Sequence, residues 1–346
     1  MPAAPLTEEQ MRSRIVRYGE LRPCTTAFID TRTPGSMEKE NFTIIGPGVA
    51  ESEEQYVHID IPHGFNIGGA RQPAGCVNSQ HSHETAEVFV VHSGRWAFTL
   101  GPEAEDGSIE LGPGDTISIP VHVFRGFTNV GDDTGFLFAV LGGDDPGHVT
   151  WAPYVFEAAA AHGLVLLDDG RLIDTGAGQS IPDGARRMPP TTQADVDRLR
   201  RMGPEEIAEC VARETELDAG AVPLVEGVPG IVESPIVGDE NPAERMPAGR
   251  MAWSHGFHVR RLKLSPGAVS PVHRRDEEEV ILMHEGTLAL SWGQSTVELT
   301  AGDVMTVPIG LDRTIRNHGE AAAVAYVVRG GDRPGAPAGV DGDESH

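Results

Sequence analysis

The feature that most constrains the fold of this chain is an internal repeat. Four positions recur 192 residues apart in the two halves: Gly75, His81, Glu87 and Gly94, then Gly267, His273, Glu279 and Gly286. A second block recurs 188 residues apart: Gly114, Pro120, Arg125 and Asn129, then Gly302, Pro308, Arg313 and Asn317. Because self-similarity at a fixed spacing indicates repeated structural units, we expect two domains of the same fold.

Both repeats lie in regions of short apolar runs separated by glycine and proline, a pattern typical of antiparallel sandwiches and barrels. The region between them reads as partly helical, for example after Pro204, and Thr7 is placed to cap a short N-terminal helix. We therefore divide the 346 residues into five parts: an N-terminal arm at 1–40, a β domain at 41–148, a partly helical connector at 149–250, a second β domain at 251–333 and a disordered tail at 334–346.

The composition excludes several classes of partner. Lys and Arg total 27 against 52 Asp and Glu, and the formal net charge of -25 repels phosphate backbones and anionic lipid headgroups. We therefore expect neither nucleic acid nor a membrane as a partner, and no stretch approaches the roughly 20 apolar residues of a membrane span. The three cysteines, Cys24, Cys76 and Cys210, form no paired motif, which favours a cytoplasmic protein.

The chemistry of the first repeat centres on His81, His83 and Glu87. On an extended strand, residues two apart share a face, so these three side chains point the same way. Two imidazoles and a carboxylate with open coordination positions form the ligand set of non-haem iron oxygenases. A polar strand face in contact with solvent is the alternative, but the apolar run VFVV at 88–91 indicates burial beside the charged cluster.

The spacing within residues 75–94 matches a known motif. It reads glycine, five residues, histidine, one residue, histidine, three residues, glutamate, six residues, glycine, which is the first motif of the cupin family. Both halves resemble cupin domains, and the whole chain resembles a bicupin whose plan is similar to the gentisate dioxygenase branch. The resemblance implies an all-β protein of two tandem double-stranded β-helix (jelly-roll, cupin) barrels, joined by the partly helical connector.

The resemblance also shows where this chain departs from the family. Arg125 stands where the second motif has its third metal-binding histidine, and His122 stands at that motif's glycine. In the second repeat, Arg275 and Arg313 replace two histidines. Because a guanidinium has no lone pair for a metal, we expect a degenerate metal site there, with an arginine paired to Glu279 or clamping a carboxylate ligand.

Three roles are open for Arg125 in the first barrel. It can bind an anionic substrate beside the metal, or it can turn aside while His122 supplies a third imidazole. It can also pair with Glu87 in a barrel that has lost its metal.

From these residues we expect a metal-dependent enzyme of the dioxygenase type. Fe(II) held by His81, His83 and Glu87 leaves positions for O2 and for a small organic acid or aromatic substrate, with Arg125 and His122 as catalytic residues. Mn, Ni or Zn at the same ligands would instead serve a lyase, decarboxylase or hydrolase. An ion pair in place of the metal would make a non-catalytic ligand-binding bicupin. Exposed sheet edges predict a homo-oligomer.

Overall fold

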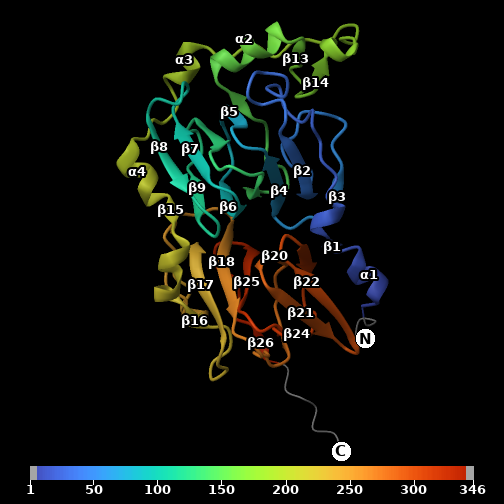
Figure 1. The fold of residues 1–346 in the computed structure, drawn as a ribbon, viewed down its shortest axis with the longest axis vertical. Coiled ribbons are helices and arrows are strands. Elements are labelled where there is room, and N and C mark those ends of the chain that lie inside the picture. The colour runs from blue at the N-terminus through green and yellow to red at the C-terminus, as the bar shows by residue number, and fades with distance from the viewer. Residues whose placement is uncertain (1–5, 340–346) are drawn as a thin grey trace, which may run out of the picture. The chain divides into compact units, whose positions relative to one another are not determined.

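The fold is described from a computed structural model for residues 6–339. The chain forms two compact units, one containing Arg22–Glu214 and the other combining Met1–Leu21 with Thr215–His346. Strands dominate each unit, and the helices are few and short (Figure 1). The predicted all-β class is therefore confirmed.

The unit of Arg22–Glu214 consists of two mostly antiparallel sheets, with a few helical turns. The larger sheet has the order β15 (Val211–Ala212), β9 (Thr116–Ile119), β6 (Glu87–Ser93), β11 (Gly135–Gly142), β4 (Phe65–Gln72), β2 (Glu40–Ile45) and β3 (Val57–Ile59). The smaller sheet has the order β12 (Thr150–Trp151), β5 (Val77–Ser82), β10 (Arg125–Asn129), β7 (Trp96–Leu100) and β8 (Gly107–Leu111). The remaining elements are α2 (Pro153–Ala161), the hairpin of β13 (Leu164–Leu166) and β14 (Leu172–Asp174), η2 (Thr175–Ala177), α3 (Gln193–Val196) and α4 (Pro204–Glu209).

The unit combining Met1–Leu21 with Thr215–His346 repeats this plan. Its larger sheet has the order β1 (Ile15–Val16), β23 (Val304–Val307), β20 (Glu279–Glu285), β25 (Ala323–Gly330), β18 (Phe257–Leu264), β17 (Ile231–Val237) and β16 (Val222–Pro223). The other strands are β22 (Ser295–Thr300), β21 (Thr287–Trp292) and β24 (Thr314–Arg316) in one sheet, and β19 (His273–Arg274) with β26 (Ala338–Gly339) in another. The helical elements are α1 (Glu8–Arg12), η1 (Tyr18–Glu20), η3 (Glu214–Gly220) and η4 (Pro242–Glu244). Two jelly-roll domains of one design are thus confirmed.

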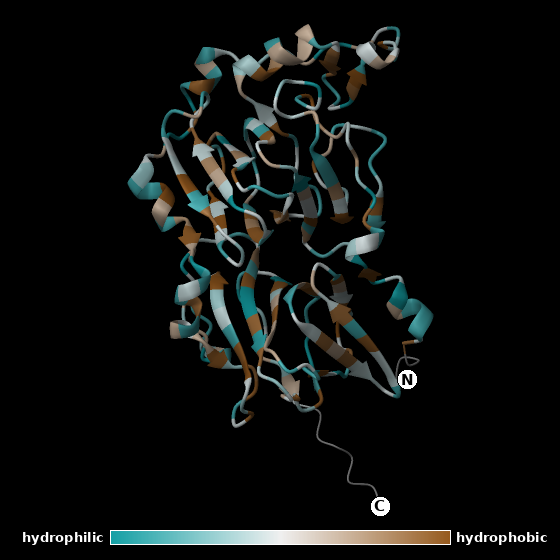
Figure 2. Cartoon of the chain, viewed as in Figure 1, coloured by the Kyte–Doolittle hydropathy of each residue, from teal (hydrophilic) through white to brown (hydrophobic). Residues whose placement is uncertain are grey.

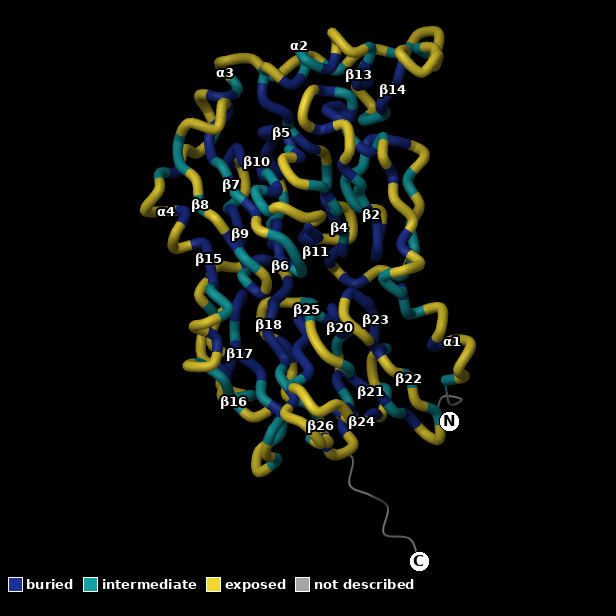
Figure 3. Tube along the Cα trace, viewed as in Figure 1, coloured by how far each residue is buried: buried dark blue, intermediate teal, exposed yellow. Residues whose placement is uncertain are grey.

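An aromatic core holds the first jelly roll together. The rings of Phe89, Trp96, Phe98 and Phe127 pack at centroid separations of 5.2 to 5.8 Å, and all four residues are buried. The first five residues of β6 are buried, which explains why this strand reads as a continuous apolar run. Hydrophobic strand segments in Figure 2 fall largely on buried parts of the trace in Figure 3, while β18 is buried although it carries Arg260, Arg261 and Lys263.

A helix followed by a short strand covers one edge of each larger sheet. The predicted cap at Thr7 of α1 is confirmed, and β1 then pairs with β23. α4 and β15 make the same arrangement on β9. Two ion pairs occupy equivalent positions: Arg17 with Asp303 at 2.6 Å, and Arg213 with Asp115 at 2.7 Å. Each module pairs the backbone groups of an edge strand that would otherwise be open.

The segment predicted as a connector, 149–250, contributes to both units. Up to Glu214 it belongs with the first jelly roll, and from Thr215 it belongs with the second, where β17 pairs along β18. The tail expected to be disordered, 334–346, contains β26, which pairs with β19. Its last part, 340–346, lies outside the described residues.

Two further observations concern the cysteines and the helices. Cys24, Cys76 and Cys210 are free and buried. Within residues 6–339, no helix combines the length and the apolar character that crossing a membrane requires.

Candidate metal centre

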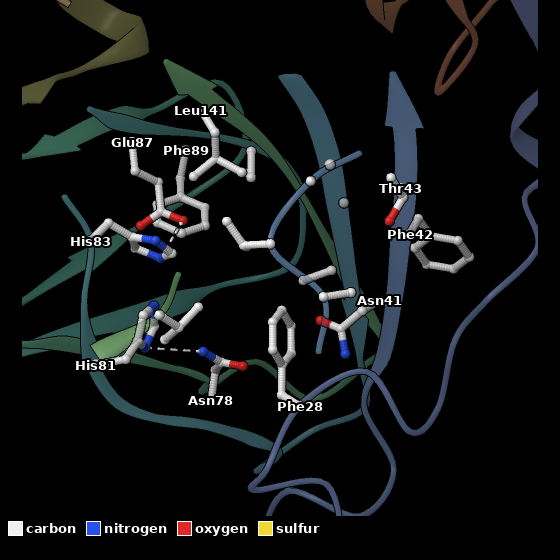
Figure 4. A pocket seen from close by; sticks show the side chains of 18 of the residues that line it. Phe28, Asn41, Phe42, Thr43, Asn78, His81, His83, Glu87, Phe89 and Leu141 are labelled. Atoms are coloured by element: carbon white, nitrogen blue, oxygen red, sulfur yellow. Dashed lines mark hydrogen bonds and ion pairs between the residues drawn. The ribbon is translucent and has the colours of Figure 1, made fainter. Parts of the chain in front are cut away.

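Two neighbouring strands of different sheets bring His81, His83 and Glu87 together. His81 lies near the end of β5, His83 directly follows it, and Glu87 begins β6. All three are buried, and one ligand atom from each lies within 4.8 Å of the others. Figure 4 shows the three side chains on one side of a pocket. The predicted convergence is present in the fold, but its cause differs from alternation along one strand, because Glu87 lies on a strand of the other sheet and His83 lies in the turn between the two strands.

The hydrogen bonds of His81 determine which ring nitrogen faces the cluster. Its Nδ1 lies 2.7 Å from the carbonyl oxygen of Ser79, an acceptor, so Nδ1 carries the proton and Nε2 keeps its lone pair. Burial, followed by the nearby His83 and Arg125, lowers the pKa of His81 to about 3. Burial and Arg125 also hold the pKa of His83 well below its ordinary value. Both imidazoles are neutral, which is the form that binds a metal.

The donor set fits a divalent metal ion. His83 Nε2 lies 3.4 Å from Glu87 Oε1, close to the roughly 3 Å between two ligand atoms that each bind one ion at about 2.1 Å. The buried Nδ1 of His83 has no hydrogen-bond partner within the described residues. Two neutral nitrogen donors beside an anionic oxygen, enclosed by protein, suit iron, manganese, nickel or zinc.

Arg125 pairs with Glu87 on the side away from His83. Its Nε and Nη2 donate to Glu87 Oε2 at 3.1 and 2.9 Å, and its Nη1 donates to the carbonyl oxygen of Val123 at 3.0 Å. Arg125 is fully buried. It lies on β10, where it pairs with His81 of β5. The guanidinium thus holds one carboxylate oxygen and leaves Oε1 facing the imidazoles.

The structure does not bring His122 into the cluster. Its side chain is exposed, and its backbone N–H donates to the carbonyl oxygen of His83 at 3.0 Å. Its φ of 60° lies in the left-handed region that favours glycine. This backbone conformation explains why the motif has glycine at the position of His122.

A pocket of about 80 Å³ adjoins the three candidate ligands. It is lined mainly by apolar side chains, including Phe28, Phe42, Phe89, Phe127 and Trp151. The indole of Trp151 packs 5.4 Å from the His81 ring, and β12 pairs the two residues directly. Trp151 was not predicted as a site residue. It lies far along the chain from the motif at 75–94, so no local sequence pattern links it to His81.

The second jelly roll carries an ion network at the equivalent place. Arg313 Nη2 donates to Glu279 Oε1 at 2.9 Å, the pair expected from the sequence, while Arg329 Nε donates to Oε2 at 2.7 Å. Arg275 Nε also lies 3.5 Å from Oε2. His273 remains, with Nδ1 3.0 Å from the carbonyl oxygen of Pro271. Both carboxylate oxygens are taken by cations, so no ligand pair is left for a metal.

The network extends beyond the residues that the motifs identify. Arg329 Nη1 and Arg260 Nη1 donate to Glu233 Oε2 at 3.0 and 2.8 Å, and Arg275 Nη1 donates to Glu244 Oε1 at 3.0 Å. All five residues are at most 5 % exposed at the side chain. The sequence feature that could have indicated this network is a charged residue inside an otherwise apolar strand, such as Glu233 in IVESPIV.

Comparisons with known proteins identify the family of the chain. A family model described as the cupin domain matches residues 70–141 and again residues 260–329. The chain is a bicupin. One curated relative of this bicupin is germin-like protein 8-14 of Oryza sativa subsp. japonica, 36% identical over 87 residues. That match covers 23% of the bicupin and 41% of the relative's own length.

Solved structures with the same fold include two oxalate decarboxylases. A deletion mutant of the Bacillus subtilis enzyme has a TM-score of 0.55 and 13% identity, covering 94% of the bicupin and 79% of that chain. The Lactobacillus farciminis enzyme in complex with formate has the same TM-score and identity, covering 94% and 88%. At this identity the likeness establishes the bicupin fold.

Replacing Arg125 by histidine is expected to slow metal loss from the bicupin to EDTA by about tenfold or more, because an imidazole adds a third nitrogen donor and frees Glu87 Oε2. The measurement is the metal retained after timed EDTA treatment, by elemental analysis. Arg125→Lys is the control, because a lysine ammonium keeps the positive charge beside Glu87 and offers no lone pair to a metal. Equal retention in the two variants would contradict the prediction.

Glu51 is a buried carboxyl that holds the pocket wall of the bicupin. Its Oε1 accepts from Trp151 Nε1 at 2.6 Å, and its Oε2 accepts from the Ile29 N–H at 2.7 Å. Burial raises the pKa of Glu51 from 4.5 to about 8. The folded state therefore binds more protons than the unfolded state between these values, so Glu51 costs stability progressively as the pH rises from 4.5 to 8.

Replacing Glu51 by glutamine is expected to flatten this pH dependence. Between pH 4.5 and 8, rising pH should cost the wild type up to about 5 kcal/mol of its free energy of unfolding, and the variant should not lose this amount. Calorimetric unfolding at several pH values measures the difference. Glu53→Gln, at an exposed neighbouring position, serves as the control and should follow the wild type. Parallel wild-type and Glu51→Gln profiles would show that Glu51 ionises normally.

Proposed function

We propose that this bicupin is a metal-dependent oxygenase whose active site is the first jelly roll. One observation supports the proposal: two neutral imidazoles and Glu87 Oε1 face one point at the wall of a buried, mostly apolar pocket. Fe(II) held by His81, His83 and Glu87 would supply the binding and activation of O2 at the positions that three protein ligands leave open.

Each residue of the site has a role in this proposal. His81 and His83 supply neutral nitrogen donors, and Glu87 supplies one anionic oxygen. Arg125 acts through Glu87 as a positioning residue, because its hydrogen bonds to Oε2 keep Oε1 turned toward His83. The exposed side chain of His122 is given no ligand role. The apolar walls exclude water from the reacting groups.

A decarboxylase or lyase that uses the same ligands is the second candidate. Its support is the fold shared with the oxalate decarboxylases of Bacillus subtilis and Lactobacillus farciminis. Mn, Ni or Zn binds the same kinds of donor atom, so the ligand set serves this chemistry as well. A non-catalytic ligand-binding protein is the third candidate, supported by the Arg125–Glu87 ion pair.

Elemental analysis combined with two activity assays separates these candidates. The oxygenase predicts about one metal ion per chain and O2 uptake, measured with an oxygen electrode, on a panel of hydroxylated aromatic compounds and hydroxy acids. Release of CO2 from oxalate without net O2 uptake would favour the decarboxylase. Less than about a tenth of an ion per chain after expression in metal-replete medium would favour the non-catalytic protein.

We also propose that the bicupin forms a homo-oligomer. The support is indirect, because jelly-roll sheets present edges and faces that neighbouring copies can cover. Size-exclusion chromatography with light scattering measures the mass in solution, and a monomer at micromolar concentration would contradict the proposal.

A further inference from the structure

The walls of the pocket beside the candidate ligands offer no cation. Among its described lining residues, the titratable ones are His81, His83 and Glu87 themselves. Arg125 is absent from the lining, because its guanidinium is buried against Glu87 and the backbone of Val123. A substrate carboxylate in contact with these walls would therefore find no positive partner.

The second jelly roll shows what the same place looks like when it is filled with charge. Four positions that line the pocket are equivalent, by the repeat spacing, to positions of the ion network in the second half. The equivalent pairs are Asn41 and Glu233, Gly68 and Arg260, His83 and Arg275, and Leu141 and Arg329. Strand register supports the equivalence, since Leu141 pairs with Glu87 and Arg329 pairs with Glu279. The first half has small or uncharged residues at three of these four positions, so Glu87 is the one charged group among the described residues that line its pocket.

Apart from the candidate metal ligands, the pocket contains one amide group that is not fully engaged. Asn78 Oδ1 accepts from Lys39 Nζ at 3.0 Å, and Thr43 Oγ1 donates to Gln55 Oε1 at 2.8 Å. The Nδ2 of Asn41, in contrast, is buried without a hydrogen-bond partner among residues 6–339. Figure 4 shows Asn41 on β2, across the pocket from His83. The Asn41 carboxamide can therefore meet a hydroxyl or carbonyl group at the end of the pocket remote from the metal ligands.

We propose, on the basis of the oxygenase function above, that the substrate has an uncharged aromatic or apolar body with a hydroxyl or carbonyl group at Asn41. A dicarboxylate is disfavoured, because burying a second carboxylate without a partner costs several kcal/mol. This inference selects the aromatic branch of the substrates considered above and assigns Asn41 as a specificity-determining residue.

The size of the pocket excludes a substrate larger than a single small ring. An apolar cavity of about 150 Å³ accepts benzene in another protein, whereas this pocket measures about 80 Å³, so even one ring requires the lining side chains to move apart on binding. Small residues make the space: Gly68 on β4 pairs with Ala139 on β11, and both line the pocket. A larger side chain at Ala139 would therefore fill it.

Benzamide and benzoate test the inference, because they share a shape and differ in charge. Their binding to the full-length protein is measured by isothermal titration calorimetry, on protein as purified and after EDTA treatment. In the EDTA-treated protein, benzamide should bind at least about tenfold more tightly than benzoate, since the walls alone then select the ligand. Asn41→Leu should weaken benzamide binding by about fivefold or more.

Ala139→Leu should abolish benzamide binding without changing the metal content, and Ala160→Leu, at an exposed position on α2, should leave both unchanged. Benzoate binding as tightly as benzamide in the EDTA-treated protein, or no binding of either, would overturn the substrate class. Conversely, a preference for benzamide in protein that contains no metal as purified would support the pocket chemistry and refute the oxygenase. The two proposals can therefore fail separately.

Discussion

Replacing both His81 and His83 by alanine is expected to lower the metal content of the purified bicupin from about one ion per chain to less than about a tenth. Glu87 alone would remain, with its Oε2 bound to Arg125. One carboxylate oxygen is too weak a site to retain a transition metal through purification. Elemental analysis measures the loss, and circular dichroism confirms that the fold is kept.

The matched control is His273→Ala in the second jelly roll. His273 occupies the position of His81 in the repeat, and both are 3 % exposed. The two oxygens of Glu279 are bound to Arg313 and Arg329, so His273 has no free carboxylate beside it. Metal content should therefore not change. Loss of metal in His273→Ala alone would place the ion in the second jelly roll instead.

Replacing Glu279 by glutamine is expected to destabilise the second jelly roll by about 3 to 5 kcal/mol, because it removes the carboxylate that the buried Arg313 binds and leaves the buried Arg329 with Glu233 alone. Glu279 interacts with three arginines, and each of them is at most 1 % exposed at the side chain. Their charges hold the pKa of Glu279 well below its ordinary value despite its burial. Scanning calorimetry should show the unfolding transition of this unit move to a lower temperature.

Glu277→Gln is the control for this change. Glu277 lies two residues away and contacts Arg275 at 3.1 Å, but its side chain is 14% exposed. Arg275 also keeps Glu244 as a partner. We expect an effect of at most about 1 kcal/mol. Equal stability of Glu279→Gln and Glu277→Gln would mean that the network does not hold the fold together.

The two halves differ in how many cations surround the motif glutamate. Glu87 is bound by Arg125 through one oxygen, whereas Glu279 is bound through both. The added cations in the second half are Arg275, at the repeat position of His83, and Arg329, at the repeat position of Leu141. Of these two, Arg329 binds the second oxygen of Glu279 at 2.7 Å. An apolar residue at this one position leaves Glu87 Oε1 available, so it is central to the difference between a metal-competent site and an ion network.

Two further segments recur between the halves. The triplet HGF at 63–65 recurs at 255–257, and GGDDPG at 142–147 recurs as GGDRPG at 330–335. In the structure the two segments of each half meet, because Asp144 accepts from the His63 and Gly64 N–H groups, and Asp332 accepts from those of His255 and Gly256. The repeat spacing indicates that the segments are equivalent, whereas their contact is set by the fold.

The sequence by itself determined the two jelly rolls and the convergence of His81, His83 and Glu87. The repeat spacing indicates two domains of one fold, the resemblance to the cupin motifs implies jelly rolls, and the same motif implies one site for the three ligands. The tertiary structure decided which oxygen Arg125 binds, that the first pocket has no cation in its described lining, and that Glu233 completes the second network. These outcomes depend on pairings such as that of Arg329 with Glu233, 96 residues apart. No local pattern specifies them, because each is set by which strands lie side by side in the fold.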